Sequence, residues 1–317
     1  GNHRANTFKE LESMVGKDIL KRYKVINHNC FDENNLKYLG KTDSNLPIWI
    51  NNVVANSDLK IITGVITPHH IAGFSGGRKS IMPGIAGIKS LEVHHSFPIR
   101  PYDIMLGKIE NNSFHTESLK AAEKVGVDFI LNVILNNKHE IVSAVAGSLN
   151  QAHLEGVKIS KELWKTPVKQ LADISIVSPG GYPRDIDLHQ SQKALSCGEL
   201  ITKPGGTIIL VSECRDGMSK FSKWLIEAVN PKDVIERFKK EGYTGEASGK
   251  AFMFARGLIK HKIIIVSDKL KKDKLKEIFV EHCNSIEKAY KIAVNDNPNN
   301  KDYYIVPFAN DILPILS

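Results

Sequence analysis

Beyond residue 167, short apolar segments alternate along the chain with longer helical ones. Runs rich in valine and isoleucine predict strands, and the segments between them carry apolar residues at helical spacing. This alternation predicts a mainly parallel, Rossmann-like sheet. Strands are expected at 174–177, 207–211 and 262–266, and helices at 187–200, 219–229, 231–240 and 248–260.

The first half of the chain also mixes helices and strands. Thr7 and Glu10 have the spacing of a helix-capping box, and apolar residues continue at helical spacing as far as Leu20. The sequence Lys-Thr-Pro at 165–167 interrupts the pattern and predicts a domain boundary. Other strands are expected at 47–54, 59–65, 129–135 and 141–145, and helices at 116–125 and 150–164.

The sequence therefore predicts an α/β protein of two domains. We expect an N-terminal mixed α/β domain at 1–166 and a Rossmann-like second domain at 167–290, with a C-terminal segment at 291–317. A cleft between two such domains is the natural place for an active site.

Polar chemistry concentrates between residues 64 and 96. The strand expected at 59–65 leads into Pro68-His69-His70, a glycine-rich turn and Lys79, and His94-His95 follow. Ligands of α/β proteins usually bind at such strand ends. A phosphate-binding loop is excluded because Arg78 occupies the position where that signature needs glycine. A surface turn with solvated histidines is the plainer alternative, and the two histidine pairs beside a lysine make it less favoured.

Three blocks of the chain resemble the nickel-pincer lactate racemase family. The central block is Pro68-His69, the run from Ala72 to Lys79, Pro83-Gly84 and His95. Gly1-Asn2-His3-Arg4 resembles the family's Gly-Thr-His-Arg-Pro motif, with Ala5 in place of the proline. The run from Gly180 to Asp185, with Gln190 and Lys193, resembles its second-domain motif. Order and spacing fit over nearly the whole chain.

The resemblance implies a cofactor-binding N-terminal domain. Lys79 would carry the nickel-pincer nucleotide, pyridinium-3-thioamide-5-thiocarboxylic acid mononucleotide, with Gly76 and Gly77 beside it and His95 as the protein ligand of nickel. Further upstream residues, holding an arginine for the substrate carboxylate, are also implied. The segment around 303–308 is expected to return to the first domain.

The implied activity is racemisation or epimerisation of a 2-hydroxy acid, lactate by default, through proton-coupled hydride transfer. His3 and His69 would be the acid/base pair, and Gln190 and Lys193 would reach the substrate from the second domain. His70 and His94 have no implied role. The implied partners are the 2-hydroxy acid and the enzymes that mature the cofactor.

Two other functions stay open at this point. One is a non-catalytic nucleotide- or metal-binding relative. The other is a metal-dependent hydrolase using His69, His70 and His95, which is weakened because no H-E-x-x-H pattern or carboxylate cluster accompanies these histidines.

Composition excludes several other classes. The 317 residues suffice for about two domains, and the net charge of +8 is scattered, so we expect no nucleic-acid partner. The densest basic run, KLKKDKLK at 269–276, is typical of a solvated helix face. No apolar run is long enough for a membrane span, and no signal peptide precedes Gly1, so we expect a cytoplasmic protein. The four dispersed cysteines, expected to be reduced and structural, are Cys30, Cys197, Cys214 and Cys283.

Overall fold

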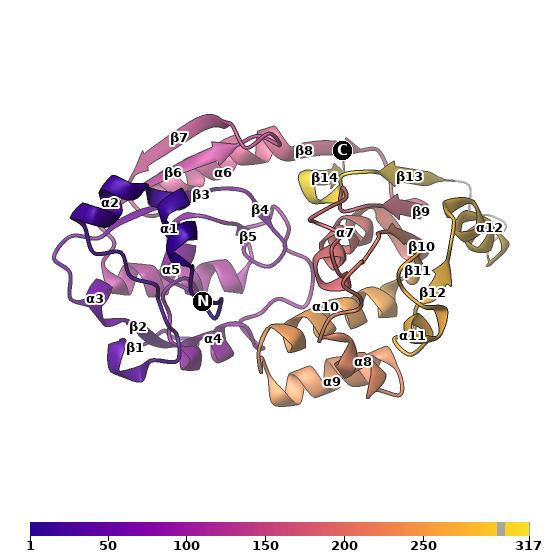
Figure 1. Ribbon diagram of the computed structural model, residues 1–317, viewed down its shortest axis with the longest axis horizontal. Coiled ribbons are helices and arrows are strands. Elements are labelled where there is room, and N and C mark those ends of the chain that lie inside the picture. Colours follow the sequence, from indigo (N-terminus) through magenta and orange to yellow (C-terminus); the bar gives the residue numbers. More distant parts are fainter. Residues whose placement is uncertain (297–301, 317) are drawn as a thin grey trace.

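The computed structural model describes residues 1–296 and 302–316, which form two lobes side by side. The first half of the chain, indigo to magenta in Figure 1, makes one lobe, and the orange and yellow second half makes the other. Both lobes combine helices and strands, as the sequence predicts. Within the described residues no helix has the length and apolar character needed to cross a membrane.

The first lobe is built on a three-stranded sheet in the order β3-β6-β7. β3 (Ile61–Val65) runs parallel to β6 (Phe129–Leu135), and β7 (Ile141–Gly147) is antiparallel to β6. These strands match the predicted ones closely. The lobe also contains β1 (Leu36–Lys41), β2 (Pro47–Asn51), α3 (Asn52–Ala55), α4 (Ile88–His94), α5 (Ser113–Val125) and α6 (Gln151–Trp164), together with the short strands β4 (Pro68–His69) and β5 (Gly73–Phe74).

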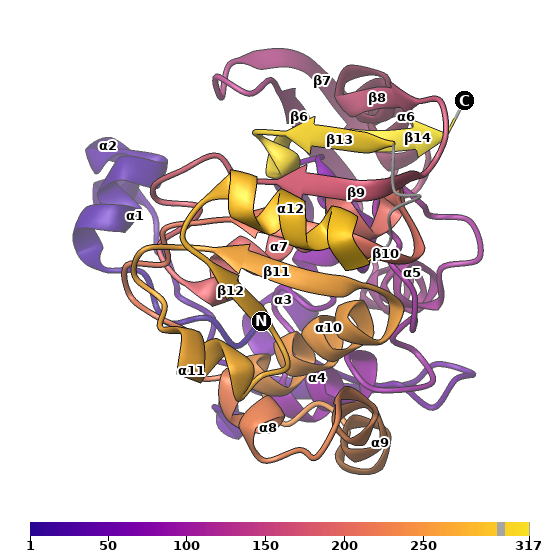
Figure 2. The same ribbon diagram turned by 90° about the vertical axis from the view of Figure 1, so that its right-hand side faces the viewer.

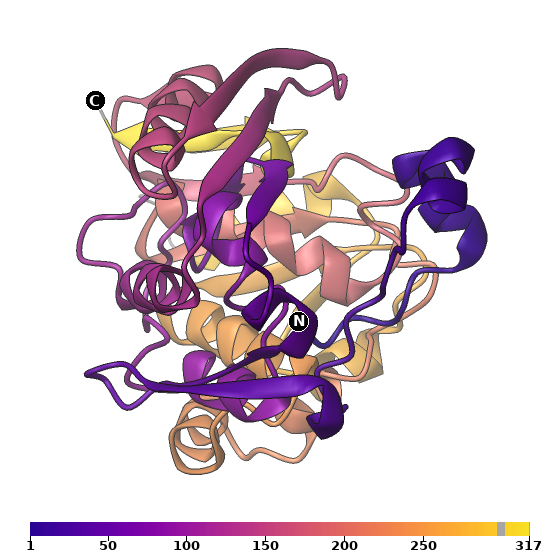
Figure 3. The same cartoon turned by 90° about the vertical axis from the view of Figure 1, so that its left-hand side faces the viewer.

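The predicted N-terminal helix is divided in two. The capping box of Thr7 and Glu10 is present and begins α1 (Phe8–Val15). Gly16, at φ 84° and ψ 156°, ends α1, and α2 (Lys17–Arg22) follows. Glycine reaches this backbone conformation at little cost, so it breaks a pattern that is apolar at helical spacing on both sides. The two indigo helices project from the lobe in Figure 3, and neither contains a buried residue.

The second lobe contains the predicted parallel sheet, in the order β12-β11-β10-β9-β13. Figure 2 shows this sheet with α12 (Ile286–Asp296) in front of it. Ile209 and Ile264 pack towards α12, whereas the alternate residues Ile208 and Ile263 face the other helices. Helices therefore cover both faces of the sheet. Its first four strands in sequence are β9 (Ala172–Val177), β10 (Thr202–Val211), β11 (Lys262–Val266) and β12 (Glu281–Cys283). On the face opposite α12 lie α7 (Leu188–Ile201), α8 (Ser222–Ile226), α9 (Pro231–Glu241) and α10 (Glu246–Lys260).

The C-terminal segment differs from its prediction in one element. β13 (Tyr303–Val306) pairs in parallel with β9, so it extends the sheet of the second lobe instead of returning to the first. The return is made further on by β14 (Leu313–Leu316), which pairs with β8 (Lys165–Val168). Leu313 then packs into a core cluster of the first lobe. Residues 297–301 and 317 of the predicted segment lie outside the described residues, and the domain boundaries themselves stay predictions.

The basic run at 269–276 forms the short helix α11 (Lys272–Lys276). Leu275 is buried while the lysines around it are exposed. The run is therefore the solvated helix face that its pattern predicts.

Candidate active site

A cavity of about 430 Å³ lies between the two lobes. It brings together five of the site residues that the family resemblance implies: His3, His69, His95, Gln190 and Lys193. The histidines come from three separate segments of the first lobe, and the other two side chains come from α7. The remaining lining residues include His70, Arg100, His189, Tyr243, Glu246, Lys250 and Met253.

The glycine-rich turn is pressed against β6. Gly76 has φ 75°, and a Cβ atom there would lie 2.7 Å from both Asn132 Oδ1 and Ile66 Cγ1. The backbone N–H of Gly77 donates to Asn132 Oδ1 at 2.7 Å. Only glycine fits this approach. Gly76, Gly77 and Lys79 are not themselves among the residues that line the cavity.

Arg78, which excluded a phosphate-binding loop, is a buried clamp on this turn. Its guanidinium donates to the carbonyl oxygens of Ala72 at 2.8 Å and Phe74 at 2.9 Å. It also lies 2.7 Å from Nε2 of His153. Burial lowers the pKa of Arg78 to about 9. The side chain thus fixes the turn that precedes Lys79 and has a structural role.

Lys79 lies in a short 3₁₀ helix, Gly77–Ser80. Burial, followed by repulsion from Arg78, lowers the pKa of Lys79 to about 7. Its charge in turn contributes to the lowered pKa of His69 and of His95. An amine with this pKa is partly unprotonated and nucleophilic at neutral pH.

His95 is oriented as metal-binding histidines commonly are. It caps the C-terminus of α4, and its Nδ1 lies 3.1 Å from the carbonyl oxygen of Leu91. A carbonyl oxygen only accepts hydrogen bonds, so Nδ1 carries the ring proton and Nε2 keeps its lone pair. Histidine ligands of metals typically donate their second ring N–H in this way.

In His69 the ring proton is on the other nitrogen than in His95. Its Nδ1 accepts hydrogen bonds from the backbone N–H groups of Ile71 and Ala72, both at 3.2 Å. Burial and the charge of Lys79 hold the pKa of His69 well below its usual value, so the ring is neutral at neutral pH. The proton of the neutral ring therefore sits on Nε2. His70 stacks on this ring with centroids 4.6 Å apart.

His3 lies on the N-terminal segment, where its side chain is exposed and makes no hydrogen bond within the described residues. Next to it, Asn2 donates to the hydroxyl of Tyr243 at 3.3 Å, which holds the segment against the second lobe. Gln190 and Lys193 share one face of α7, as their spacing predicts, with the lysine amine 2.8 Å from Gln190 Oε1.

The chain is similar to known proteins over most of its length. Residues 1–104 match the model of the lactate racemase N-terminal domain, and residues 168–312 match that of the C-terminal domain. The lactate racemase of Thermoanaerobacterium thermosaccharolyticum is 36% identical, over 97% of this chain and 73% of its own length. The chain belongs to the lactate racemase family. The lactate racemase of Lactiplantibacillus plantarum is 34% identical over 91% of this chain and 69% of its own.

Solved structures extend the comparison to the fold. The apoprotein structure of the Thermoanaerobacterium thermosaccharolyticum lactate racemase has a TM-score of 0.93 and 34% identity, covering 99% of this chain and 76% of that one. A Thermotoga maritima protein has a TM-score of 0.66 at 18% identity, covering all of this chain and 84% of the other, and it shows likeness of fold alone.

Several cavity residues of this lactate racemase family member were not predicted from the sequence: Arg100, His189, Glu246 and Lys250. His189 Nε2 lies 3.0 Å from Glu246 Oε1, and this contact lowers the pKa of the carboxyl to about 2. Lys250 stands in a helical stretch, 248–257, whose residues are all buried in the structure. Lysine is seldom buried in this way, but the burial is known only from the fold.

Metal binding by protein groups alone is not supported. Within the described residues no three histidine, cysteine or acidic side chains are grouped so that they could hold a metal ion. This finding argues against the hydrolase alternative built on His69, His70 and His95. The four cysteines are buried and unpaired, as expected.

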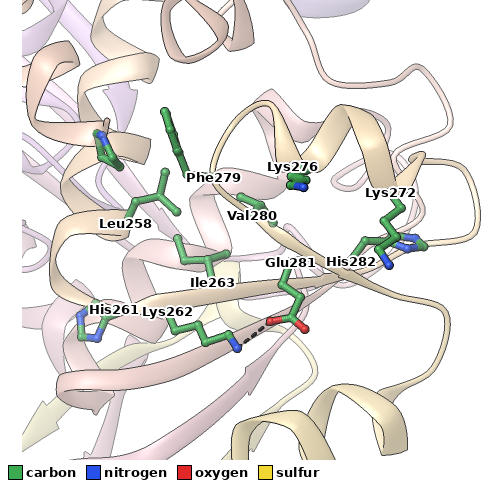
Figure 4. Close-up of a pocket in the computed structure, with 11 residues that line it drawn as sticks. Leu258, His261, Lys262, Ile263, Lys272, Lys276, Phe279, Val280, Glu281 and His282 are labelled. Atoms are coloured by element: carbon green, nitrogen blue, oxygen red, sulfur yellow. Dashed lines mark ion pairs between the residues drawn. The ribbon is translucent and has the colours of Figure 1, made fainter. Parts of the chain in front are cut away.

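A second cavity, of about 400 Å³, lies at the far side of the second lobe. Figure 4 shows its lining, which includes the ion pair between Lys262 and Glu281 at 2.6 Å. None of the predicted site residues reaches it. The cavity between the lobes is therefore the candidate active site of this family member.

Proposed function

We propose that this chain is a racemase or epimerase of a 2-hydroxy acid, with lactate as the default substrate, and that a nickel-pincer nucleotide is attached to Lys79. The observation that carries this proposal is the single cavity that receives His3, His69 and His95 from one lobe and Lys193 from the other. Membership of the lactate racemase family supports it. The proposed partners are the 2-hydroxy acid and the maturation enzymes, in the cytoplasm.

The residues present fit this cofactor at two points. The pKa of about 7 makes the Lys79 amine available for a covalent bond, and His95 keeps a lone pair on Nε2. Nickel accepts imidazole together with soft sulfur ligands. A thio-substituted cofactor that brings its own donors therefore needs few ligands from the protein, in keeping with a lone His95. When bound, the cofactor supplies the acceptor for the hydrogen at C2.

The histidines would move the proton of the substrate hydroxyl group. Oxidation at C2 releases this proton, and a neutral imidazole is a suitable base at neutral pH. The His3 ring makes no hydrogen bond within the described residues, and it is suited to accept this proton. His69, with its proton on Nε2, is suited to donate a hydrogen bond to a substrate oxygen. His69 accepts a proton at Nε2 only if its ring gives up both bonds to the backbone.

Residues of α7 would bind the substrate. The amine of Lys193 supplies positive charge for the substrate carboxylate, and Gln190 holds that amine in place. Lys193 is an exposed residue, so its amine can reach a carboxylate that enters the cavity.

The test is to express the chain together with cofactor maturation enzymes and to measure intact mass, nickel content and racemisation of each lactate enantiomer by chiral chromatography. We expect a mass increase that maps to Lys79, about one nickel per chain, and conversion of either enantiomer to the mixture. Lys79→Ala should lose all three. Lys158→Ala, at a side chain that is 74% exposed, is the matched control and should lose none.

Unmodified, nickel-free protein from cells that mature a known lactate racemase would overturn the proposal. Such a result would favour the non-catalytic binding alternative. Racemisation by the Lys79→Ala protein would refute the role of Lys79 even if nickel were present.

A further inference from the structure

Two cations of the cavity have no acidic partner within the described residues. Arg100 is 3% exposed and Lys250 is 8% exposed. Arg100 Nη2 donates to the carbonyl oxygen of Gly249 at 3.3 Å, and its guanidinium lies 5.0 Å from the centroid of the Phe252 ring. The amine of Lys250 reaches only the carbonyl oxygen of His189, at 3.5 Å. A buried cation without a counter-charge is costly, and an anion bound beside it would reduce that cost.

The charges around the cavity do not balance. Three cationic side chains line it, those of Arg100, Lys193 and Lys250. The one carboxylate in the lining belongs to Glu246, and it is already paired with His189. A 2-hydroxy acid with one carboxylate brings a single negative charge. A substrate with two carboxylates matches the cavity better.

The three cationic side chains of the cavity lie in two places. Lys193 lies on α7 next to Gln190, whereas Lys250 lies on α10 and Arg100 donates to the residue before it. The Arg100 guanidinium is held by the rings of Phe238 and Phe252, so it offers its donors in a fixed direction. A fixed guanidinium beside an amine is a good receptor for a carboxylate.

Building on the proposed function, we propose that the substrate is a 2-hydroxy dicarboxylate. Arg100 and Lys250 hold the carboxylate remote from the hydroxyl group, and Lys193 serves the carboxylate beside it. Discrimination against lactate then arises at Arg100 and Lys250, which take no part in moving the proton.

Binding to the protein without cofactor tests this inference separately from catalysis. Calorimetry would compare L-malate with L-lactate, using the full chain. A desolvated charge pair is worth at least about 2 kcal/mol, equivalent to about 30-fold in affinity. We expect malate to bind at least 30-fold more tightly than lactate, and Lys250→Met to remove most of this preference. Lys250→Arg should keep much of it, because the charge remains.

Two controls show whether the effect of Lys250→Met is specific to the dicarboxylate. Lys223→Met replaces a lysine whose side chain is 78% exposed and should leave the preference unchanged. Nicotinic acid mononucleotide is the second probe, because a cofactor phosphate is the other source of an anion. If Lys250→Met weakens the mononucleotide and leaves the malate preference intact, the cations serve the nucleotide and the inference is overturned.

The remaining outcomes are equally decisive. Equal affinity for malate and lactate, or no binding of either, overturns the dicarboxylate assignment. Equal loss of both ligands in Lys250→Met places this lysine at the shared carboxylate and also overturns it. With the loaded enzyme, turnover of lactate but not malate refutes the inference alone. Tight malate binding without turnover of any 2-hydroxy acid refutes the proposed function and leaves the binding site standing.

Discussion

Gly76 offers a sharp test of how the turn before Lys79 is built. Its backbone, at φ 75° and ψ −179°, lies in a region that is nearly restricted to glycine. Gly16 has a similar conformation, at φ 84° and ψ 156°. The two positions differ in their surroundings, because a Cβ atom at Gly16 would meet nothing within 4 Å. Replacing each by alanine therefore separates backbone strain from steric overlap.

The expected magnitudes follow from these contacts. Backbone strain costs about 1–3 kcal/mol at either site. At Gly76 the new methyl group would also lie 2.7 Å from Asn132 Oδ1 and Ile66 Cγ1. Both residues are 0% exposed, so neither side chain has room to move away. Overpacking of this kind adds about 1–3 kcal/mol. Gly76→Ala should thus be less stable than Gly16→Ala by about 1–3 kcal/mol.

Urea denaturation followed by circular dichroism measures both variants. A lower midpoint with an unchanged slope would report a loss of stability alone. Gly76→Ala should also lower the yield of cofactor at Lys79, because the bond from the Gly77 N–H to Asn132 is displaced. Equal losses of stability at the two glycines would refute the packing argument and leave only the backbone term.

Three further predictions concern single groups. The rate of Lys79 acylation should rise with pH through a midpoint near pH 7, because the amine is neutral above its lowered pKa. Ordinary lysines titrate near pH 10.4. Mass mapping across a pH series measures the midpoint, and a value near 10 would contradict the prediction. Glu199→Ala should cost about 3–5 kcal/mol in urea denaturation, since it leaves Arg256 buried without its bidentate partner, and Arg256→Met in the same chain should recover part of the loss. Nitrogen-15 NMR should find the proton of the neutral His69 ring on Nε2, and a proton on Nδ1 would remove the argument that this ring is set as a donor.

The fold was predictable where the local pattern determines an element. β6 and β11 have the expected bounds because each is dominated by isoleucine, leucine and valine. β12 was not predicted, since three residues at a sheet edge are too few to show a period. The pairing of β13 was also missed. Tyr303 and Ile305 are exposed on this edge strand, so its sequence does not indicate which sheet it joins.

The sequence predicted the histidines and the lysine of the site, but it did not predict two of its buried cations. His69, Lys79 and His95 lie in one stretch of the sequence, 69–95, so one motif contains them. Arg100 and Lys250 meet through folding across about 150 positions, and no local pattern connects them. Sequence motifs therefore located the histidines and the lysine proposed for catalysis and cofactor attachment. They did not locate Arg100 and Lys250, the cations proposed to select the substrate.

These two groups of residues are coupled by electrostatics. The cations of Lys250 and Arg100 lower the pKa of His70, and Lys79 lowers that of His69, in both cases after the effect of burial. An anion in the cavity opposes these positive charges and so raises the pKa of each ring. Burial and these charges thus hold His69 and His70 neutral at neutral pH. A bound carboxylate brings the pKa of each ring closer to neutrality, where a histidine exchanges protons most readily. Recognition of the substrate by Arg100 and Lys250 would in this way prepare the histidines of the first lobe for proton transfer.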